Sequence, residues 1–254
     1  MDNPLLVSVL TLCILSLSVV IGALLRRGRK LEQSAREHYN ILLAATLTML
    51  FLIIGFSFSM ATNRYDQRKN YEEAEANAIG TEYVRADLLP ATDAEKIRAL
   101  LGKYIEQRLM FYTTRDDQRL AQINAYTEQL QAELWSVVKE SATSRPAPII
   151  ALVASGMNDV LNSQGYTQAA WWNRIPIAAW VLMLSIAICC SLLVGYGVRD
   201  IKAELILFPI LPIVVSIAFF LIADIDSPRG GFIRVSPQNI ISFSESLHSS
   251  AATE

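Results

Sequence analysis

Residues 41–62 read ILLAATLTMLFLIIGFSFSMAT and contain no charged side chain. A helix of about 20 apolar residues crosses the ~30 Å hydrocarbon core of a bilayer, so this stretch is long enough to span a membrane. Three more uncharged runs occur, of 22, 24 and 19 residues, at Pro4–Leu25, Ile175–Val198 and Leu205–Ala223. The sequence therefore predicts an integral membrane protein with four spans.

The composition excludes several other classes of protein. Only 18% of the 254 residues are charged, whereas an ordinary globular chain has about 25%, so a soluble enzyme is excluded. A net charge of -2, without a cluster of basic residues interleaved with aromatic ones, argues against a nucleic-acid partner. All three cysteines fall inside predicted spans, and the two histidines stand alone in the sequence. We therefore expect no catalytic residue, cofactor, metal site or disulfide.

The residues between the second and third spans have a different composition. Residues 63–174 hold 13 of the 22 Lys and Arg residues and 15 of the 24 Asp and Glu residues. Apolar residues recur there at helical spacing, which predicts helices over 65–88, 92–113, 117–141 and 148–162, the second opened by a capping box of Thr92 and Glu95. We read Glu72, Glu73, Glu75 and Glu82, interleaved with basic residues, as a solvated helix face.

Together these patterns predict an all-α protein in four segments. Spans 1 and 2 occupy residues 1–62, a helical extramembrane domain occupies 63–174, and spans 3 and 4 occupy 175–223. Residues 224–254 are expected to form a turn motif after the membrane and then a serine-rich, disordered tail without periodicity.

The charges beside the spans do not fix the orientation. Basic residues in short loops favour the cytoplasm, and seven of them would place both termini and the helical domain outside: Arg26, Arg27, Arg29, Lys30, Arg36, Arg199 and Lys202. Six others, on the opposite side, abut the spans: Arg64, Arg68, Lys69, Arg174, Arg229 and Arg234.

The second span has one face of small and hydroxyl-bearing residues. On a helical wheel this face comprises Thr48, Leu52, Gly55, Ser59, Thr62 and Asn63, with Phe56 at its margin. Such a face usually packs closely against another helix. The alternative is a pore lining in which Leu52 and Phe56 form a hydrophobic constriction. The residues alone leave both open.

Two polar motifs stand outside the spans. Asp224 and Asp226 precede Ser-Pro-Arg-Gly-Gly at 227–231, where the fourth span leaves the membrane. A carboxylate there needs a partner, and we expect Arg64, Arg68 or Arg229. The second motif, Glu75-Ala-Asn-Ala-Ile-Gly80, favours close helix packing, with a buried Glu75–Asn77 contact as the alternative.

These motifs resemble the bacterial bestrophin-like family of unknown function, distant relatives of the bestrophin channels. The resemblance rests on Gly55-Phe56 followed by Arg64-Tyr65, on Glu75 to Gly80, on Leu88-Leu89-Pro90, and on Asp224 to Gly230. It covers residues 40–236, and the acidic motifs are more specific than the Gly-Phe spacing. The chain departs from the family in having Ser57 where a bulky residue is usual.

The resemblance implies a homopentameric ion channel with an axial pore, cytoplasmic termini and a cytoplasmic helical domain, in a bacterial inner membrane. The pore and neck would be lined by Thr48, Leu52, Gly55, Phe56, Ser59 and Asn63. Asp224, Asp226 and Arg229 replace the acidic run of calcium-regulated bestrophins, which argues against calcium gating because Ca²⁺ takes 6–8 oxygen ligands.

Basic residues at the pore mouth, Arg64, Arg68 and Lys69, predict that small anions such as chloride permeate. The opposing hypothesis is a protein that conducts nothing. In that case the helical domain would bind a ligand or partner and the chain would act as a membrane sensor.

Overall fold

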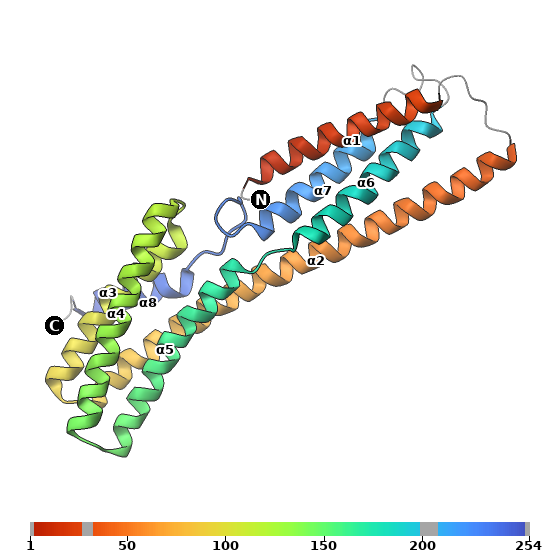
Figure 1. Ribbon diagram of the computed structural model, residues 1–254. Helices are drawn as coiled ribbons and strands as arrows, with labels where there is room; N and C mark the ends of the chain where they lie inside the picture. Colours follow the sequence, from red (N-terminus) through yellow and green to blue (C-terminus); the bar gives the residue numbers. More distant parts are fainter. Residues whose placement is uncertain (1–2, 27–32, 199–207, 252–254) are drawn as a thin grey trace. The chain divides into compact units, whose positions relative to one another are not determined.

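The computed structural model describes residues 3–26, 33–198 and 208–251, and every regular element in these ranges is helical (Figure 1). The chain is therefore an all-α protein, as predicted. In chain order the elements are α1 (Pro4–Arg26), α2 (Gln33–Arg85), the short 3₁₀ helix η1 (Ala86–Leu88), α3 (Ala91–Thr113), α4 (Asp117–Ser144), α5 (Pro148–Trp172), α6 (Ile177–Gly197), α7 (Ile210–Asp226) and α8 (Gln238–Ala251).

The helices form two compact units. Unit 1 comprises residues 1–65 and 174–234, and unit 2 comprises residues 66–173 and 235–254. Helix α2 supplies residues to both units, because it is continuous from Gln33 to Arg85. Between α5 and α6 the helix is interrupted at 173–176, where Pro176 is the N-cap of α6. Helix α2 therefore runs from the second span into the helical domain without a break, whereas the third span begins after this interruption.

In the part of the chain that the structure describes, three helical stretches are long and apolar enough to cross a membrane: Pro4–Arg26, Ser34–Leu88 and Pro148–Gly197. They contain the first three predicted spans. The fourth overlaps α7, an apolar helix of 17 residues, and its predicted start at 205–207 lies outside the described residues. Arg27, Arg29, Lys30, Arg199 and Lys202 also lie outside them.

Helices α1 and α6 of unit 1 approach each other at two glycines. A Cβ built on Gly22 would collide with the carbonyl oxygen of Leu192, and one built on Gly195 would collide with that of Val19. Small residues let helix backbones approach closely inside a membrane. The core beside this crossing is mainly apolar and includes Leu15, Met183 and Phe219, with Ser18 and Ser191 also buried.

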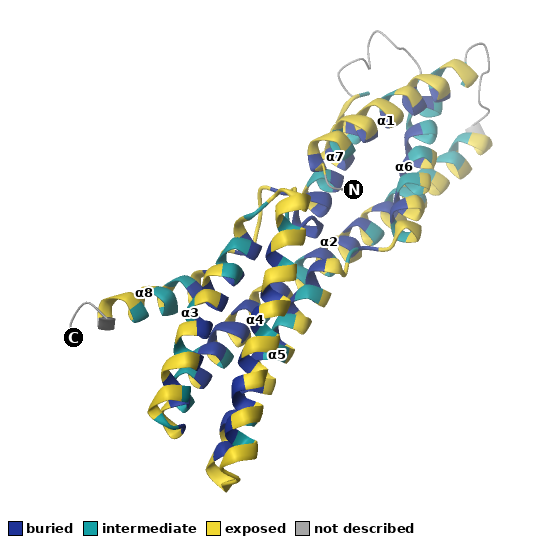
Figure 2. Ribbon diagram, turned by 60° about the vertical axis from the view of Figure 1, so that its left-hand side comes forward, coloured by how far each residue is buried: buried dark blue, intermediate teal, exposed yellow. Residues whose placement is uncertain are grey.

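Helices α3, α4 and α5 of unit 2 bury one face each and expose the other (Figure 2). An aromatic cluster of Phe111, Tyr112 and Trp171 joins α3 to α5, with ring centroids 5.0–5.5 Å apart. The predicted capping box is wrong: α3 begins at Ala91 with Pro90 as its N-cap, and no side chain caps it. Proline suits the start of a helix, because the backbone N–H that it lacks would have no partner within the helix there.

The prediction of a disordered tail is also wrong, because residues 238–251 form α8. The Glu72 carboxylate of α2 accepts hydrogen bonds from the backbone N–H groups of Asn239 and Ile240, at 3.0 and 3.1 Å. A negative charge at this end of a helix satisfies free N–H groups and complements the helix dipole. Ile240 is buried, and Phe243 packs edge to face on Tyr83 of α2.

Buried positions on α2 recur at alternating steps of four and three residues along most of the helix. In unit 1 they are Leu50, Ile54, Ser57 and Ala61, and in unit 2 they are Arg68, Glu72, Glu75, Ile79 and Glu82, with Ala76 buried beside Glu75. This seven-residue repeat is the spacing of a helix that packs along one continuous seam. The apolar half of the seam gives way to a strongly polar one after residue 61.

Candidate functional site

The small face of the second predicted span is uncovered in this chain. Thr48, Leu52, Gly55, Phe56, Ser59 and Asn63 are all exposed, Leu52 at 56% and Phe56 at 65%. A Cβ built on Gly55 would meet no atom within 4 Å. Within residues 3–26, 33–198 and 208–251, the face therefore packs against no other helix of the same chain.

The opposite side of α2 is the packed side. Leu50, Ile54 and Ala61 belong to the core of unit 1 together with Met183 of α6 and Phe219 of α7. The bulky residues of the second span thus hold α2 to its own unit, while the smaller ones remain free for water, lipid or another subunit. Among the described residues, no helix of the same chain supplies the close packing that one of the two interpretations of this face requires.

The three basic residues expected at the pore mouth do not form one group. Arg68 is buried, and Arg64 is partly buried and ion-paired with Asp226, so both lie on the packed side of α2. Lys69 is exposed. Successive residues of a helix are about 100° apart, so Arg64 and Arg68 fall on the same face of α2 as Leu50 and Ile54. Lys69 falls on a different face. The predicted basic cluster is therefore reduced to Lys69.

Asp226 joins three helices of unit 1, and its predicted pairing with Arg64 is confirmed. Its Oδ1 lies 3.4 Å from Nη1 of Arg64 on α2. Both carboxylate oxygens accept a hydrogen bond from the backbone N–H of Ile175, just before α6, at 3.1 Å. Since Asp226 is the last residue of α7, one buried carboxylate ties together the ends of α6 and α7 and the middle of α2.

Asp224 holds the turn that follows α7. Its two oxygens accept hydrogen bonds from the N–H groups of Phe232 and Ile233, at 2.7 and 2.9 Å. Gly231 is required by this geometry, because a Cβ there would collide with the carbonyl oxygen of Asp224. Arg229 lies partly exposed in the same turn. Carboxylates that face N–H donors are arranged as structural acceptors, unlike the ligands of a cation.

Glu75 is the centre of a buried polar cluster in unit 2. Its carboxylate is ion-paired with Arg108 of α3, with a second hydrogen bond from Nη2 at 3.3 Å. Tyr112 of α3 and Thr167 of α5 donate hydroxyl hydrogen bonds to it at 3.0 and 3.1 Å. Burial raises the pKa of Tyr112, and the Glu75 charge raises it further, so the phenol stays protonated as a donor.

The alternative of a Glu75–Asn77 contact is not realised, because Asn77 is exposed. The interpretation of the acids as a solvated face is wrong for three of them: Glu72, Glu75 and Glu82 are buried. Their spacing of three and seven residues, in phase with Ile79, was the signal in the sequence. Arg108 and Thr167 were missed because a single polar residue within an apolar stripe resembles an ordinary surface position.

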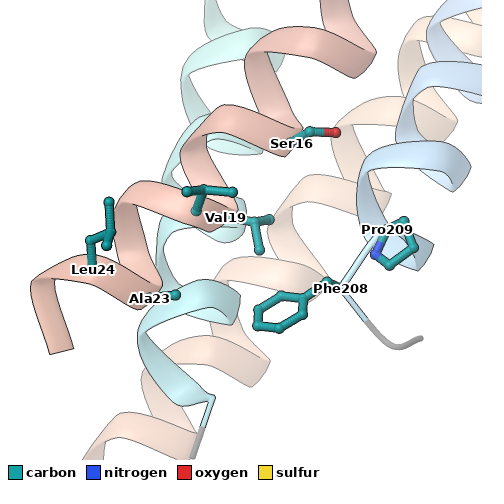
Figure 3. Close-up of a pocket in the computed structure, with 7 residues that line it drawn as sticks. Ser16, Val19, Ala23, Leu24, Phe208 and Pro209 are labelled. Atoms are coloured by element: carbon teal, nitrogen blue, oxygen red, sulfur yellow. The ribbon is translucent and has the colours of Figure 1, made fainter. Parts of the chain in front are cut away.

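The chain also has an apolar pocket in unit 1. It has a volume of about 370 Å³ and is lined by one side of α1 and by the residues before α7: Ser16, Val19, Val20, Ala23, Leu24, Phe208 and Pro209 (Figure 3). Ser16 is the one residue of this lining with a polar side chain. Such a lining suits a hydrocarbon chain rather than a hydrated ion.

Comparisons with known proteins agree with this architecture. A crystal structure of a bacterial bestrophin homologue from Klebsiella pneumoniae superposes with a TM-score of 0.63 at 14% identity, covering 93% of this chain and 98% of that one. Two point variants of a bestrophin homologue from the same organism give TM-scores of 0.64 and 0.65 at 13% identity, covering 95% of this chain and 98% and 97% of theirs. At this identity the likeness shows the fold.

No functionally curated protein matches the sequence. The sequence profile of the Bestrophin-like domain matches residues 10–240, which is most of the chain and includes the exposed face of α2, the Glu75 cluster and the Asp226 junction. The expected resemblance is thereby confirmed. This multi-pass, all-helical membrane protein belongs to the bestrophin-like family.

Proposed function

We propose that this protein is an ion channel of the bestrophin type, assembled from several copies of the chain around an axial pore, with five copies as the expected number. The observation that carries the proposal is the uncovered face of α2. Inside a membrane, a face of small and hydroxyl-bearing residues that no described helix of the same chain covers favours contact with water or with a second subunit, even where a hydroxyl, such as that of Thr48, also donates to its own helix at Ala44. A closed ring of subunits supplies both.

In this proposal Leu52 and Phe56 form the hydrophobic neck, and Thr48, Gly55, Ser59 and Asn63 line the pore on either side of it. Exposed apolar side chains in a ring create a constriction that dewets easily. Weakly hydrated anions cross such a neck most readily, because removing their hydration water costs the least free energy. Chloride is the expected physiological ion, in a bacterial inner membrane with unit 2 on the cytoplasmic side.

Conduction of cations is the second candidate, and a particular observation favours it. Past the neck, the exposed side of α2 carries Asp66 and Glu73 as well as Lys69, whereas Arg64 and Arg68 are turned away from it. Two acids against one base would raise the local concentration of cations at this end of the pathway. Reversal potentials under salt gradients decide between the two ions.

The first experiment measures chloride and iodide flux from liposomes that contain the purified protein. Leu52→Ala and Phe56→Ala should each increase the flux several-fold or broaden its selectivity, because trimming the neck lowers the dehydration barrier. Phe58→Ala is the matched control, since Phe58 is an exposed aromatic residue of the same helix off that face. Flux unchanged in both neck variants would overturn the assignment of the neck.

A silent protein, verified as folded and inserted, would instead favour the non-conducting sensor. For the charge at the pore end, Lys69→Gln should reduce anion preference, while Asp66→Asn combined with Glu73→Gln should increase it. A reversal potential that follows the cation in the wild-type protein, and moves toward the anion only in the double variant, would establish the second candidate.

A further inference from the structure

Three acids of α2 are buried in unit 2, and two of them have obvious partners. Glu75 is ion-paired with Arg108, and Glu72 accepts the N–H groups of α8. The third, Glu82, is as fully buried as Glu75. Both of its carboxylate oxygens lack a hydrogen-bond partner among the residues that the structure describes. An unpaired carboxylate is costly in such a position when it is ionised.

The space around Glu82 is created by a glycine on the facing helix. A Cβ built on Gly156 of α5 would collide with Oε2 of Glu82 and would lie 2.5 Å from Nη1 of Arg85. The carboxyl group therefore rests against bare backbone of α5, in a notch that any other residue would fill. Arg85 donates instead to the carbonyl oxygen of Leu152, at 3.4 Å.

Two charged groups act on Glu82. Arg85, one turn further along α2, favours the ionised form, and Asp159 of α5 opposes it. Asp87 of η1 and Arg98 of α3, charged residues of two other elements of unit 2, are ion-paired with each other. Burial is the dominant influence and raises the pKa of Glu82 to about 8. The group is thus neutral at pH 7 and becomes ionised just above it.

We propose that Glu82 is a proton-binding site that controls how α2 packs against α5, and that loss of its proton at mildly alkaline pH loosens this contact. The protonated carboxyl fits the notch at Gly156 without a charge to solvate. The ionised carboxylate requires water or a closer approach of Arg85, and either of these changes the α2–α5 contact. Because α2 also carries the exposed Leu52–Phe56 face, the site is placed to make ion flux sensitive to pH.

Proton binding itself can be tested without any assay of transport. Infrared difference spectra of the intact protein in nanodiscs, taken between pH 6 and 10, should show a protonated-carboxyl band that disappears with a midpoint near pH 8. The band should be absent in Glu82→Gln and retained in Glu106→Gln, an exposed acid of α3. A spectrum identical in wild type and Glu82→Gln would overturn the proposal.

The neighbouring charges provide a test of opposite sign. Asp159→Asn removes a negative charge and should lower the midpoint, whereas Arg85→Gln removes a positive charge and should raise it. Both variants keep Glu82 and Gly156, so they remain informative if Glu82→Gln folds poorly. Midpoints that do not move, or that move together, would show that the titrating group is not Glu82.

The effect on flux rests on the proposed function and is read separately. In a conducting wild-type protein, flux should change across the same midpoint, and Glu82→Gln should hold it at its low-pH value. If the infrared band titrates while the protein conducts nothing at any pH, the channel proposal fails and the proton site stands. A pH-independent flux with a titrating band would remove only the link between the site and the pore.

Discussion

At the scale of single residues, Asp226 and Glu75, two of the buried carboxylates that have partners, are expected to matter for folding rather than for permeation. Asp226→Ala leaves the N–H of Ile175 and the guanidinium of Arg64 without their acceptor. A buried donor that loses its partner costs about 1–3 kcal/mol, so we expect a loss of about 2–4 kcal/mol once the charge of Arg64 is included.

Thermal unfolding in detergent and size-exclusion chromatography measure this change in Asp226→Ala. The assembled species should dissociate more easily, while the selectivity of any remaining flux stays as in the wild type. Asp226→Asn should lose less stability, since its amide oxygen can still accept the hydrogen bond from the backbone N–H of Ile175. Unchanged oligomer stability in Asp226→Ala would count against a structural role for this carboxylate.

Glu75→Gln tests the second carboxylate. It leaves Arg108 buried without an opposite charge, and breaking a buried pair in this way costs about 3–5 kcal/mol. Glu73→Gln, at an exposed position on the same helix, should change stability by less than about 0.5 kcal/mol. Chemical denaturation of the two variants makes the comparison. Replacing Glu75 and Arg108 together by Leu and Met should restore much of the loss.

The burial of Glu82 gives a predicted pH dependence of stability. Its pKa is raised from 4.5 to about 8 in the folded chain, so between these values the folded state holds a proton that the unfolded state has released. The free energy of unfolding from this group therefore falls as the pH rises through that window, and levels off above about 8. In Glu82→Gln, the melting temperature should therefore fall less steeply with rising pH than it does in the wild type.

At the scale of elements, the glycines of unit 1 have two distinct roles. Gly195→Ala should destabilise the protein by several kcal/mol or prevent insertion, because its Cβ would overlap the α1 backbone at Val19. Gly55→Ala meets no atom of its own chain, so it should fold normally and alter flux alone. Comparing melting temperatures and flux of the two variants separates packing from pore lining.

Helix α8 provides a second prediction about an element. Glu72→Ala removes the acceptor for two of its backbone N–H groups, a loss typically of about 0.5–2 kcal/mol for a helix cap. Hydrogen exchange in residues 238–251 should accelerate, while exchange in α4 stays as in the wild type. Equal protection of α8 in wild type and variant would show that Ile240 and Phe243 suffice to hold it.

The elements also show how far the sequence carries the prediction. Residues with strong apolar runs or clear helical stripes, such as those of α1 and α3, were assigned to helices within a few residues. Helix α8 was missed because five serines obscure its stripe of Ile240, Phe243 and Leu247, and because its cap is supplied by Glu72, far away in the chain. Contacts of that kind have no local signature.

The candidate site follows the same division. The free face of α2 could be drawn on a helical wheel, since periodicity is a local property of the chain. The partners of Glu75 could not be found, because Arg108 and Thr167 lie on two other helices and only the fold brings them together. Arg68 was misplaced because its charge suggested exposure more strongly than its position in the repeat suggested burial.

At the scale of the whole molecule, the uncovered face of α2 predicts self-association. One chain has a mass of 28.2 kDa, and native mass spectrometry of the protein released from detergent should show a single closed multiple of it, with five as the expected number. Phe56→Glu places a charge in the ring of subunits around the pore. It should leave Asp226 and its contacts intact but weaken the assembly or alter the gating of the pore. A monomer that conducts ions would contradict an axial pore.

The seven-residue repeat of α2 also limits how this gene can change in length. One residue inserted at the junction of Tyr65 and Asp66 turns everything beyond it by about 100°. Glu72, Glu75 and Glu82 would then leave their buried positions, or the Leu52–Phe56 face would turn inward. An insertion of seven residues restores the phase. Insertions and deletions in this helix should therefore be tolerated only where the residues added or removed complete whole helical turns, however neutral they are.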